Sequence, residues 1–580
     1  MAISKILDAS GHPIKTASPV TTKARAMSGR GRAFDQFLPY DSAKYETQHM
    51  EGWHPVLTSP DQENFLRDTI VARQRDQIRN DGFASGAITR ICDNTIGAFF
   101  RPIPAPDYQV LSRATGIKAF DHEWARDFTR ALDANWRTWS EGTYCDTARI
   151  NNFSQQMFLA FRHFLIDGDA LARMRWMPKR VGKGKAHYAT AFELIDADRL
   201  SNPQLRFDNK YMRGGVEVDA DSAPVAYYMR EAHQGDWYNV AKSLTWERVP
   251  KETSWGRLNV VHVFSPDRAA QHRGIGGIFL PVLERMRMLF RYDRAELDAA
   301  IINSVFANFI TSPNDHESTA DALDSGEDGI GAYEELRAEF HHENDIKIGE
   351  AKIPILFPGE EIKSVLANRP SSNFAAFESA VLNNISMGLG LSAAQLSNDF
   401  SKVNYSSARS AILEAWKTMS RRKNDFAVRF ANPIRQCFIE ESFDRDSLPL
   451  PKGAPDFIDY REAYSRADWP GVARGWVDPV AETQGAQMQL EAGFNTLKAV
   501  CAEQNLDFEE VLEQRKYEIE KFKEYGIPLP DWTGANLQKE ADAKVTTADA
   551  SQTSADASQT TADKPVPEPA KDDGGKPGGD

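Results

Sequence analysis

Cysteine is scarce in this chain. There are four cysteines in 580 residues, Cys92, Cys145, Cys437 and Cys501, and no two of them form a Cys-x-x-Cys pair. A disulfide framework and a cysteine-based zinc site both need closely spaced pairs. We therefore expect free thiols in a reducing compartment and no structural metal.

Long apolar runs are also missing. The first residues, up to Lys15, contain no apolar core of signal-peptide length. The longest apolar run, Ala299 to Ile310, is interrupted by Asn303 and Asn308 and is too short to cross a bilayer. The sequence therefore predicts a chain that is made in the cytoplasm and does not enter a membrane.

An excess of basic residues is absent as well. The 69 Lys and Arg residues are outnumbered by 83 Asp and Glu residues, so the net charge is −14 and the sequence pI is about 5.5. A sequence-reading DNA-binding protein would show a basic face or a basic domain, which argues against that class. The length indicates two to four domains.

Catalytic and ligand-binding motifs are missing too. The run Arg273–Gly277 matches neither a dinucleotide fingerprint nor a phosphate-binding loop, and we interpret it as a flexible lead-in to a helix. Asp167-Gly168-Asp169 lacks the later ligands of a calcium loop and is typical of a turn. His341-His342-Glu343 lacks zinc-protease spacing, and His262, in an apolar strand, is typical of a buried core histidine. The sequence predicts no catalytic residue, no cofactor and no metal, which favours a structural or assembly protein.

What the chain does contain is an unusual pair of helices within Phe374–Phe443. Apolar residues recur with helical spacing up to Leu389, an irregular loop follows to Asn404, and a very long helix starts at Tyr405. At about 1.5 Å per residue this helix reaches on the order of 50 Å, and we expect Pro433 to kink it near its end. Such a helix is typical of a coiled coil, a bundle or a channel wall.

The rest of the chain mixes helices and strands, so the predicted fold class is α+β. We expect a helix from about Ser59, helices over Phe83–Ile96, Ala119–Trp139, Phe153–Ile166, Gly277–Thr311 and within about 480–525, and strands over Ala170–Trp176, Ala189–Ile195, Gly214–Glu217, Val225–Met229, Val260–Phe264 and Ile353–Phe357. Residues 548–561 repeat a seven-residue unit without large apolar side chains, which predicts a disordered tail.

A cluster of basic residues lies on the long helix. Its members are Lys417, Arg421, Arg422, Lys423 and Arg429. Lys417 and Arg421 are four residues apart and share one face of the helix. Two interpretations stay open: a solvated polar face, or a surface that contacts nucleic acid or acidic residues of a neighbouring subunit.

Several short strings between residues 75 and 480 are informative through their order. They are Arg75–Asn80 with Asn94–Gly97, Phe164–Ala170, Phe192–Leu200, Gly214–Glu217 with Pro224–Tyr228, His262–Phe264 with Asp267-Arg268 and Gln271–Gly274, Phe357–Glu360, Asn404–Arg409, and Trp476–Pro479. Together they resemble the lambda-like portal protein family of tailed bacteriophages. No single string is decisive, but the shared order makes the resemblance specific.

The resemblance implies a phage portal fold with a wing, a helical stem, a clip and a crown. The implied bounds are 1–58 for a flexible N-terminal arm, 59–276 for the wing, 277–311 for the first stem helix, 312–372 for the clip, 373–389 for the second stem helix, 390–404 for the tunnel loop, 405–443 for the long channel-backing helix, 444–530 for the crown, and 531–580 for a disordered tail.

The resemblance also implies a function and a set of partners. Subunits of this family form a ring of about twelve copies at the unique capsid vertex. The ring conducts double-stranded DNA during packaging and ejection. Its implied partners are the terminase large subunit, capsid and scaffold proteins, and head–tail adaptor proteins. The implied location is the virion, after assembly in the host cytoplasm.

The resemblance places the loop Gly390–Asn404 in the channel. The residues expected to line the bore are Ser397, Asn398, Asp399, Ser401, Lys402, Asn404 and Arg409. Among them, Lys402 and Arg409 are candidates for brief contacts with phosphate, because a mostly acidic wall guides DNA without retaining it. The candidates for contact with DNA or a neighbouring subunit are Lys417, Arg421 and Arg422.

There are two alternatives to a portal protein. Another head–tail connector or a minor capsid protein is the structural alternative, but such proteins are usually much shorter. A nucleic-acid packaging enzyme is the alternative from another class. It would need a phosphate loop and a carboxylate cluster for magnesium, and the sequence contains neither.

Overall fold

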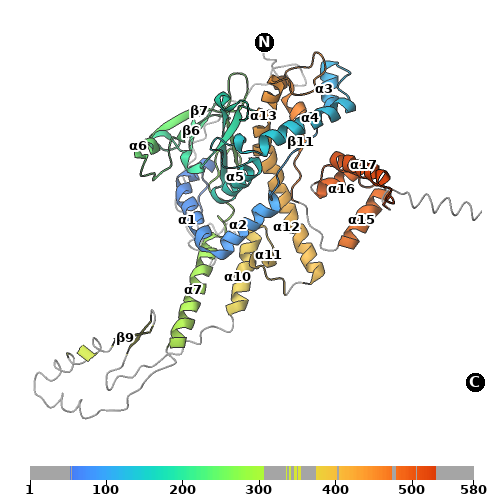
Figure 1. Cartoon of the computed structure of the whole chain (residues 1–580). Helices are drawn as coiled ribbons and strands as arrows, with labels where there is room; N and C mark the ends of the chain where they lie inside the picture. The colour runs from blue at the N-terminus through green and yellow to red at the C-terminus, as the bar shows by residue number, and fades with distance from the viewer. Residues whose placement is uncertain are drawn as a thin grey trace, which may run out of the picture. The chain divides into compact units, whose positions relative to one another are not determined.

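The computed structural model describes residues 53, 55–305, 335, 339–340, 345–348, 351–354, 374–401, 404–472, 479–504 and 506–530 (Figure 1). The chain divides into a unit of residues 1–63 and a compact unit of residues 64–580. Several predicted segments lie wholly or largely outside the described residues. They are the arm (1–58), the clip (312–372), the tail (531–580), and the strings Phe357–Glu360 and Trp476–Asp478.

Helices form the first part of the second unit, and polar caps fix where several of them begin. The elements are the 3-10 helix η3 (Pro60–Leu66), α1 (Arg67–Asn80), α2 (Gly82–Thr95), the short strand β1 (Ile103–Pro104), α3 (Tyr108–Thr115), α4 (His122–Ser140) and α5 (Phe153–Asp167). Asp81 caps α2 by accepting a hydrogen bond from Phe83 N at 2.8 Å. Asn152 and Gln155 form a capping box at the start of α5. The three predicted helices that correspond to α2, α4 and α5 are confirmed, whereas α3 was not predicted.

Two antiparallel sheets follow. The first has the order β3–β2–β8 and contains β2 (Asp169–Trp176), β3 (Thr190–Ile195) and β8 (Val260–Phe264). The second has the order β4–β5–β6–β7 and contains β4 (Met212–Arg213), β5 (Val216–Val218), β6 (Pro224–Arg230) and β7 (Trp246–Pro250), with the short helix α6 (Val240–Ser243) before β7. Leu171 on β2 lies opposite Ile195 on β3 and belongs to a buried cluster with Val216 and Tyr227 of the second sheet. The strands predicted over Ala170–Trp176, Ala189–Ile195, Val225–Met229 and Val260–Phe264 are confirmed as β2, β3, β6 and β8. The strand predicted from Gly214 begins later, at Val216, because Gly214 and Gly215 have a left-handed backbone and form the turn between β4 and β5.

The helix predicted from Gly277 begins later. In the structure α7 spans Leu283–Val305, and residues 277–282 form turns that pack against α5. The start predicted at Gly277 is therefore wrong, because the glycines before α7 are in close backbone contact with α5. Residues from 306 to the predicted end at Thr311 lie outside the described residues.

The predicted helix–loop–helix is present, with one addition. It comprises α10 (Phe374–Leu389), the short helix α11 (Ala393–Ser397), α12 (Tyr405–Phe426), a π-helical turn (Ala427–Ala431) and α13 (Asn432–Asp444). The irregular loop predicted between the long helices therefore contains a helix. Figure 1 shows α10 beside α7, and Tyr292 on α7 contacts the rings of Phe374 and Phe377 at 5.7 and 5.1 Å between centroids.

The long helix runs on past Pro433. Proline has no N–H to donate to the preceding turn, and the irregularity it requires takes the form of the π-helical turn directly before α13. The helical run therefore reaches from Tyr405 to Asp444, close to the predicted end at Phe443.

Aromatic side chains join α13 to the first helices of the unit. The Phe438 ring on α13 stacks on Trp139 of α4 at 5.0 Å and meets the Trp136 ring at 5.4 Å. The buried carboxylate of Glu441 accepts hydrogen bonds from the backbone N–H groups of Ala189 and Thr190, both at 2.7 Å. One turn of α13 is thus fixed to the edge of β3 as well as to the core.

Short elements complete the description. They are β9 (Asp345–Ile348) paired with β10 (Ala351–Pro354), α14 (Arg461–Ser465), β11 (Ala467–Asp468) paired with β1, and the helices α15 (Pro479–Glu491), α16 (Leu497–Glu503) and α17 (Phe508–Glu524). The strand predicted from Ile353 begins earlier, at Ala351, and the helices predicted within 480–525 are confirmed. Among the described residues, no helix is long and apolar enough to cross a membrane.

Candidate channel segment and the ion-pair junction behind it

The first half of the predicted channel loop is held in the fold. Gly390 takes a left-handed backbone with φ of +72°, and Leu391 N then donates to Ser386 O at 3.0 Å. Ser392 and Gln395 form a capping box that starts α11. Leu391 and Leu396 are both buried in the main core. Residues 390–396 are therefore a fixed base rather than a free loop.

The described residues in the second half of this loop are exposed. The chain turns again at Asn398, with φ of +60°, and the side chains of Asn398, Asp399, Phe400 and Ser401 face solvent. Asp399 Oδ1 accepts hydrogen bonds from Ser401 N at 2.9 Å and Ser401 Oγ at 2.6 Å. Asn404 is exposed and caps α12 by accepting from Ser407 N at 2.9 Å. We call residues 398–404 the tip.

For the other three residues that were predicted to line the bore, the outcome differs from one to the next. Ser397 is half-buried and donates to Ala393 O at 2.9 Å, so it belongs to the base. Lys402 lies outside the described residues. Arg409, on α12, faces Glu482 of α15 at 3.8 Å. The structure thus leaves the side chains of Asn398, Asp399, Ser401 and Asn404 exposed and places Arg409 beside a carboxylate.

The basic cluster on α12 separates into surface and interior side chains. Lys417 and Arg421 are exposed, and Lys417 Nζ lies 2.6 Å from Glu414. Arg422 is turned inward: its Nη2 donates to Leu389 O at 3.0 Å, and burial, with the charge of Arg421, lowers its pKa to about 10.

The two remaining basic residues of the cluster also have contacts inside the chain. Burial lowers the pKa of Lys423, whose stem packs against Gly471. Arg429 donates to Phe264 O at 2.9 Å. The solvated-face interpretation therefore fits only Lys417 and Arg421 within this cluster.

Behind the channel segment, several of the family-like strings meet in one buried junction. Asp169, at the start of β2, is fully buried, and its Oδ2 lies 3.0 Å from Arg273 Nε and 3.3 Å from Arg67 Nε. Its Oδ1 accepts a hydrogen bond from Gly274 N at 2.7 Å and lies 3.3 Å from His262 Nε2. Burial alone would raise the pKa of Asp169, but Arg273 and Arg67 outweigh it and lower that pKa.

A second group of carboxylates surrounds Arg75 on α1. Its Nε donates to Asp167 Oδ1 and its Nη2 donates to Asp167 Oδ2, both at 2.8 Å, which is a bidentate arrangement. Its Nη1 and Nη2 also donate to Asp198 at 2.6 Å and to Asp196 at 3.0 Å. Burial would raise the pKa of Asp167, but the hydrogen bonds that Asp167 makes with His163 and Arg75 lower that pKa. The junction therefore ties α1, α5 and the end of β3 together.

Glycines allow the chain segment before α7 to reach this junction. Gly168 has φ of +80°, and a Cβ there would lie 2.5 Å from Gly276 O. A Cβ at Gly274 would overlap Gly168 O, and one at Gly277 would overlap Leu165 O. The interpretation of Arg273–Gly277 as a flexible lead-in is therefore wrong, because these glycines provide close backbone packing.

The strings can be read from the sequence, but the junction that they form cannot. Asp167-Gly168-Asp169 is a turn, as expected, yet both of its carboxylates are buried and paired. Two aspartates directly after the apolar run of α5 were the available signal, because an acidic group so close to a core must find a cation. The prediction of His262 as a buried core histidine is confirmed, with Asp169 as its partner.

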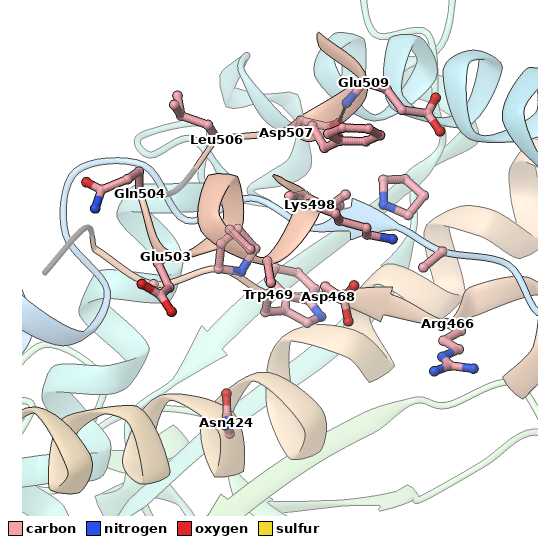
Figure 2. Close-up of a pocket in the computed structure, with 18 of the residues that line it drawn as sticks. Asn424, Arg466, Asp468, Trp469, Lys498, Glu503, Gln504, Leu506, Asp507 and Glu509 are labelled. Atoms are coloured by element: carbon pink, nitrogen blue, oxygen red, sulfur yellow. Dashed lines mark hydrogen bonds between the residues drawn. The ribbon is translucent and has the colours of Figure 1, made fainter. Parts of the chain in front are cut away.

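A cavity of about 960 Å³ lies where α16 and α17 approach α4, α12 and the segment after α14. Figure 2 shows Trp469, Asp468 and Lys498 among its mixed polar and apolar lining. Arg101 and Arg137 of the first helical region pair with Glu510 of α17, with Arg101 at 2.9 Å. No group of His, Cys, Asp and Glu with metal-binding geometry occurs in the part of the chain that the structure describes.

Comparison with known proteins gives the family. The model of the phage portal protein family of the lambda type matches residues 46–423. The chain is 30% identical to portal protein B of Escherichia phage lambda, over 84% of this chain and 90% of that protein. It is 29% identical to the portal protein of Escherichia phage N15 over the same shares, and 26% identical to a probable portal protein of Halomonas phage phiHAP-1 over 80% and 82%.

Solved structures were compared as well. The neck of a native gene transfer agent particle is 12% identical, with a TM-score of 0.34, covering 79% of this chain and 97% of that one. The virion of the native particle is also 12% identical, with a TM-score of 0.35, covering 77% and 99%. The family model and the sequence relatives carry the assignment: the chain belongs to the lambda family of phage portal proteins, which makes it a structural protein of a phage particle rather than an enzyme.

Proposed function

We propose that copies of this chain close into a ring of about twelve subunits at one capsid vertex and conduct double-stranded DNA during packaging and ejection. A single interface repeated head to tail closes into a ring when the rotation between subunits divides a full turn. The observation that carries the proposal is the exposed polar side chains Asn398, Asp399, Ser401 and Asn404 of the tip, which follow a buried base between two long helices.

The predicted division of the chain becomes part of this proposal. The α+β region up to residue 276 would be the wing, α7 and α10 the stem, residues 312–372 the clip, α12 and α13 the support behind the tunnel loop, and residues 444–530 the crown. The terminase large subunit and the head–tail adaptors would dock on the ring, and capsid and scaffold proteins would surround it. Assembly would take place in the host cytoplasm.

Contact with DNA would be weak and brief. Each stable phosphate contact releases counterions and adds affinity, which would slow a moving duplex. In the tip, Asp399 would repel the backbone and Lys402 would attract it. At Arg409 a phosphate would compete with Glu482, which lies 3.8 Å away. Lys417 and Arg421 would contact DNA or the neighbouring subunit, whereas Arg422 is already bonded within its own chain.

Charge reversal tests this proposal. The double variant Lys402→Glu and Arg409→Glu would be compared in particles with the control Lys452→Glu, which alters an exposed lysine beyond α13. We expect less packaged and retained DNA for the double variant and no change for the control. Unchanged packaging and retention in the double variant would remove both residues from the proposal. Negative-stain microscopy must show rings with an axial hole, and a monomer with ATPase activity would overturn the portal function altogether.

A further inference from the structure

The carbonyl ends of α10 and α11 are both closed by arginines from other helices. The last carbonyl groups of any helix lack partners within it, and a helix as short as α11 is not stable alone. Arg90 of α2 donates to the carbonyls of Gln395 and Leu396, the latter at 3.0 Å. Arg422 of α12 donates to Leu389 O at 3.0 Å. Each arginine therefore holds one end of the base.

Arg90 is well placed for this because its own helix is fixed. Its neighbours Ile88, Ile91 and Cys92 are fully buried in the main core. A guanidinium presents several donors in a rigid plane, so a single side chain can bond two successive carbonyls. Its positive charge also complements the negative end of a short helix. Arg90 thus fixes α11 to α2, in addition to the connections of α11 to α10 and α12 along the chain.

Arg422 makes a similar contact at the end of α10, where it bonds the carbonyl of Leu389. The guanidinium is half-buried beside Gly390, where a Cβ would lie 3.0 Å from Thr418 Cγ2 and 3.7 Å from Arg422 Nη2. Even with its pKa lowered to about 10, Arg422 stays charged at neutral pH. The left-handed turn at Gly390 is therefore enclosed by α12, and the chain direction into α11 is set there.

The carbonyls that Arg90 bonds lie between two residues with a left-handed backbone, and Leu389, whose carbonyl Arg422 bonds, directly precedes the first of them. Gly390 and Asn398 both have positive φ, at +72° and +60°, and they bracket α11. The buried side chains of Leu391 and Leu396 hold the inner face of this short segment. The bonds from Arg422 to Leu389 and from Arg90 to Gln395 and Leu396 are polar contacts from other helices to the carbonyl ends of α10 and α11.

We propose that Arg90 and Arg422 are positioning residues that hold the base 390–397 in one place, so that the tip starts from a fixed position at Asn398. The part of this inference that concerns DNA rests on the proposed function, because it takes the tip to line the bore. The part that concerns the base can be tested on the purified chain alone.

Hydrogen–deuterium exchange on the full chain tests the base. Arg90→Ala removes two charge-assisted hydrogen bonds, and we expect the hydrogen-bonded amides of Gln395 and Leu396 to exchange about tenfold faster. Arg90→Lys can reach one carbonyl as a point charge and should recover part of the protection. Arg73→Ala, at an exposed arginine on α1, is the matched control and should change nothing in this segment. Unchanged exchange in Arg90→Ala would overturn the inference while leaving the proposed function intact.

Packaged particles test the consequence for DNA. We expect Arg90→Ala and Arg422→Gln rings to assemble normally but to retain less DNA than rings of the native chain, with Arg90→Lys in between. If exchange rises while DNA retention stays native in both variants, the base does not position a DNA contact and the inference is wrong. If Arg90→Ala does not assemble, Arg90→Lys and Arg422→Gln decide by the same comparison. If native rings themselves hold no DNA, the proposed function fails first.

Discussion

Two clusters of arginine and carboxylate in this chain have similar distances but lie in different surroundings. In the buried junction, Asp169 lies 3.0 Å from Arg273 and its side chain is 0% exposed. On the surface, Glu510 of α17 lies 2.9 Å from Arg101 and its side chain is 44% exposed. The junction joins α1, β2 and the segment before α7, whereas the surface cluster joins α17 to the first helical region.

The comparison shows that burial, rather than distance, decides what each cluster contributes. Removing one partner of a buried pair leaves the other charge without solvation, which costs several kcal/mol. An exposed pair is solvated with or without its partner and contributes about 0–1 kcal/mol. Helices α15 and α17 also contain no buried residue in the part of the chain described. The junction is thus a fixed support, and the C-terminal helices are held weakly.

The largest expected effect is the loss of the junction carboxylate. Asp169→Ala leaves Arg273 and Arg67 buried with their charge unbalanced, so we expect the free energy of unfolding to fall by about 3–5 kcal/mol. Urea unfolding followed by circular dichroism measures it. Asp221→Ala, at an exposed carboxylate, is the control and should change stability by under about 0.5 kcal/mol. A loss below about 1 kcal/mol for Asp169→Ala would contradict the importance given to burial.

The second-largest expected loss of stability comes from filling the close backbone contact at Gly277, beside the junction. In Gly277→Ala the new methyl group meets the backbone oxygens of Leu165 and Ile166, which cannot rotate away, so we expect a loss of about 1–3 kcal/mol. The matched control is Gly86→Ala, inside α2, where a Cβ has nothing within 4 Å. That control should be neutral or more stable by about 0.5–1 kcal/mol, because alanine favours a helix. Equal effects from both substitutions would rule out close packing.

A third carboxylate, Asp293 on α7, extends the comparison to a site with unfavourable neighbours. Burial, together with the negative charges of Glu378 and Asp81, raises its pKa to about 6. Its contribution to stability is therefore fully present below the unfolded pKa of about 4 and is lost as the pH rises through about 6. Asp169 has a lowered pKa, so its contribution to stability depends on pH in the opposite direction: it is present at neutral pH and is lost only as the solution becomes acidic.

Asp293→Asn should separate these two pH dependences. The neutral amide removes the penalty of the ionised carboxylate, so we expect the variant to be more stable than the native chain at pH 7.5. At pH 4, where the native side chain is protonated when folded, the two should be nearly equal. Urea midpoints at both pH values measure the difference, and Asp298→Asn on the same helix serves as the exposed control. A gain at pH 4 as large as that at pH 7.5 would refute the assignment.

The smallest expected effect is at the surface cluster. Glu510→Gln removes the charge that faces Arg101 and Arg137, and we expect a stability loss of under about 1 kcal/mol at low salt. The loss should vanish near 1 M salt, where the screening length is about 3 Å. Glu520→Gln, at an exposed position of the same helix, is the control. A salt-independent loss of several kcal/mol would show that the C-terminal helices are held as firmly as the junction.

Much of the fold follows from local patterns. The apolar spacing of α5 and α12 and the strands of the β2–β3 hairpin were predicted from the sequence, since each depends on neighbouring residues. The pairing of β1 with β11 was not, because these two-residue strands are separated by most of the chain and leave no periodic signal. The helix α11 could have been predicted, because Ser392 and Gln395 have the spacing of a capping box.

The candidate site was predictable in outline only. The order of the short strings located the channel segment between residues 390 and 404, but not the division into a buried base and an exposed tip. That division depends on Arg90, which is distant in sequence, and on two carbonyls that no side-chain pattern encodes. Arg422 was predicted to contact DNA or another subunit because its neighbours are basic, whereas its packing against Gly390 directs it inward.

The central claim is that the tip faces DNA in the assembled ring. Thiol labelling of Ser401→Cys in particles tests it directly, because all four native cysteines are buried. We predict rapid reaction with a maleimide in empty particles and protection in DNA-filled ones, while Thr138→Cys, at an exposed position of α4, reacts alike in both. Equal labelling of Ser401→Cys in filled and empty particles would contradict the claim.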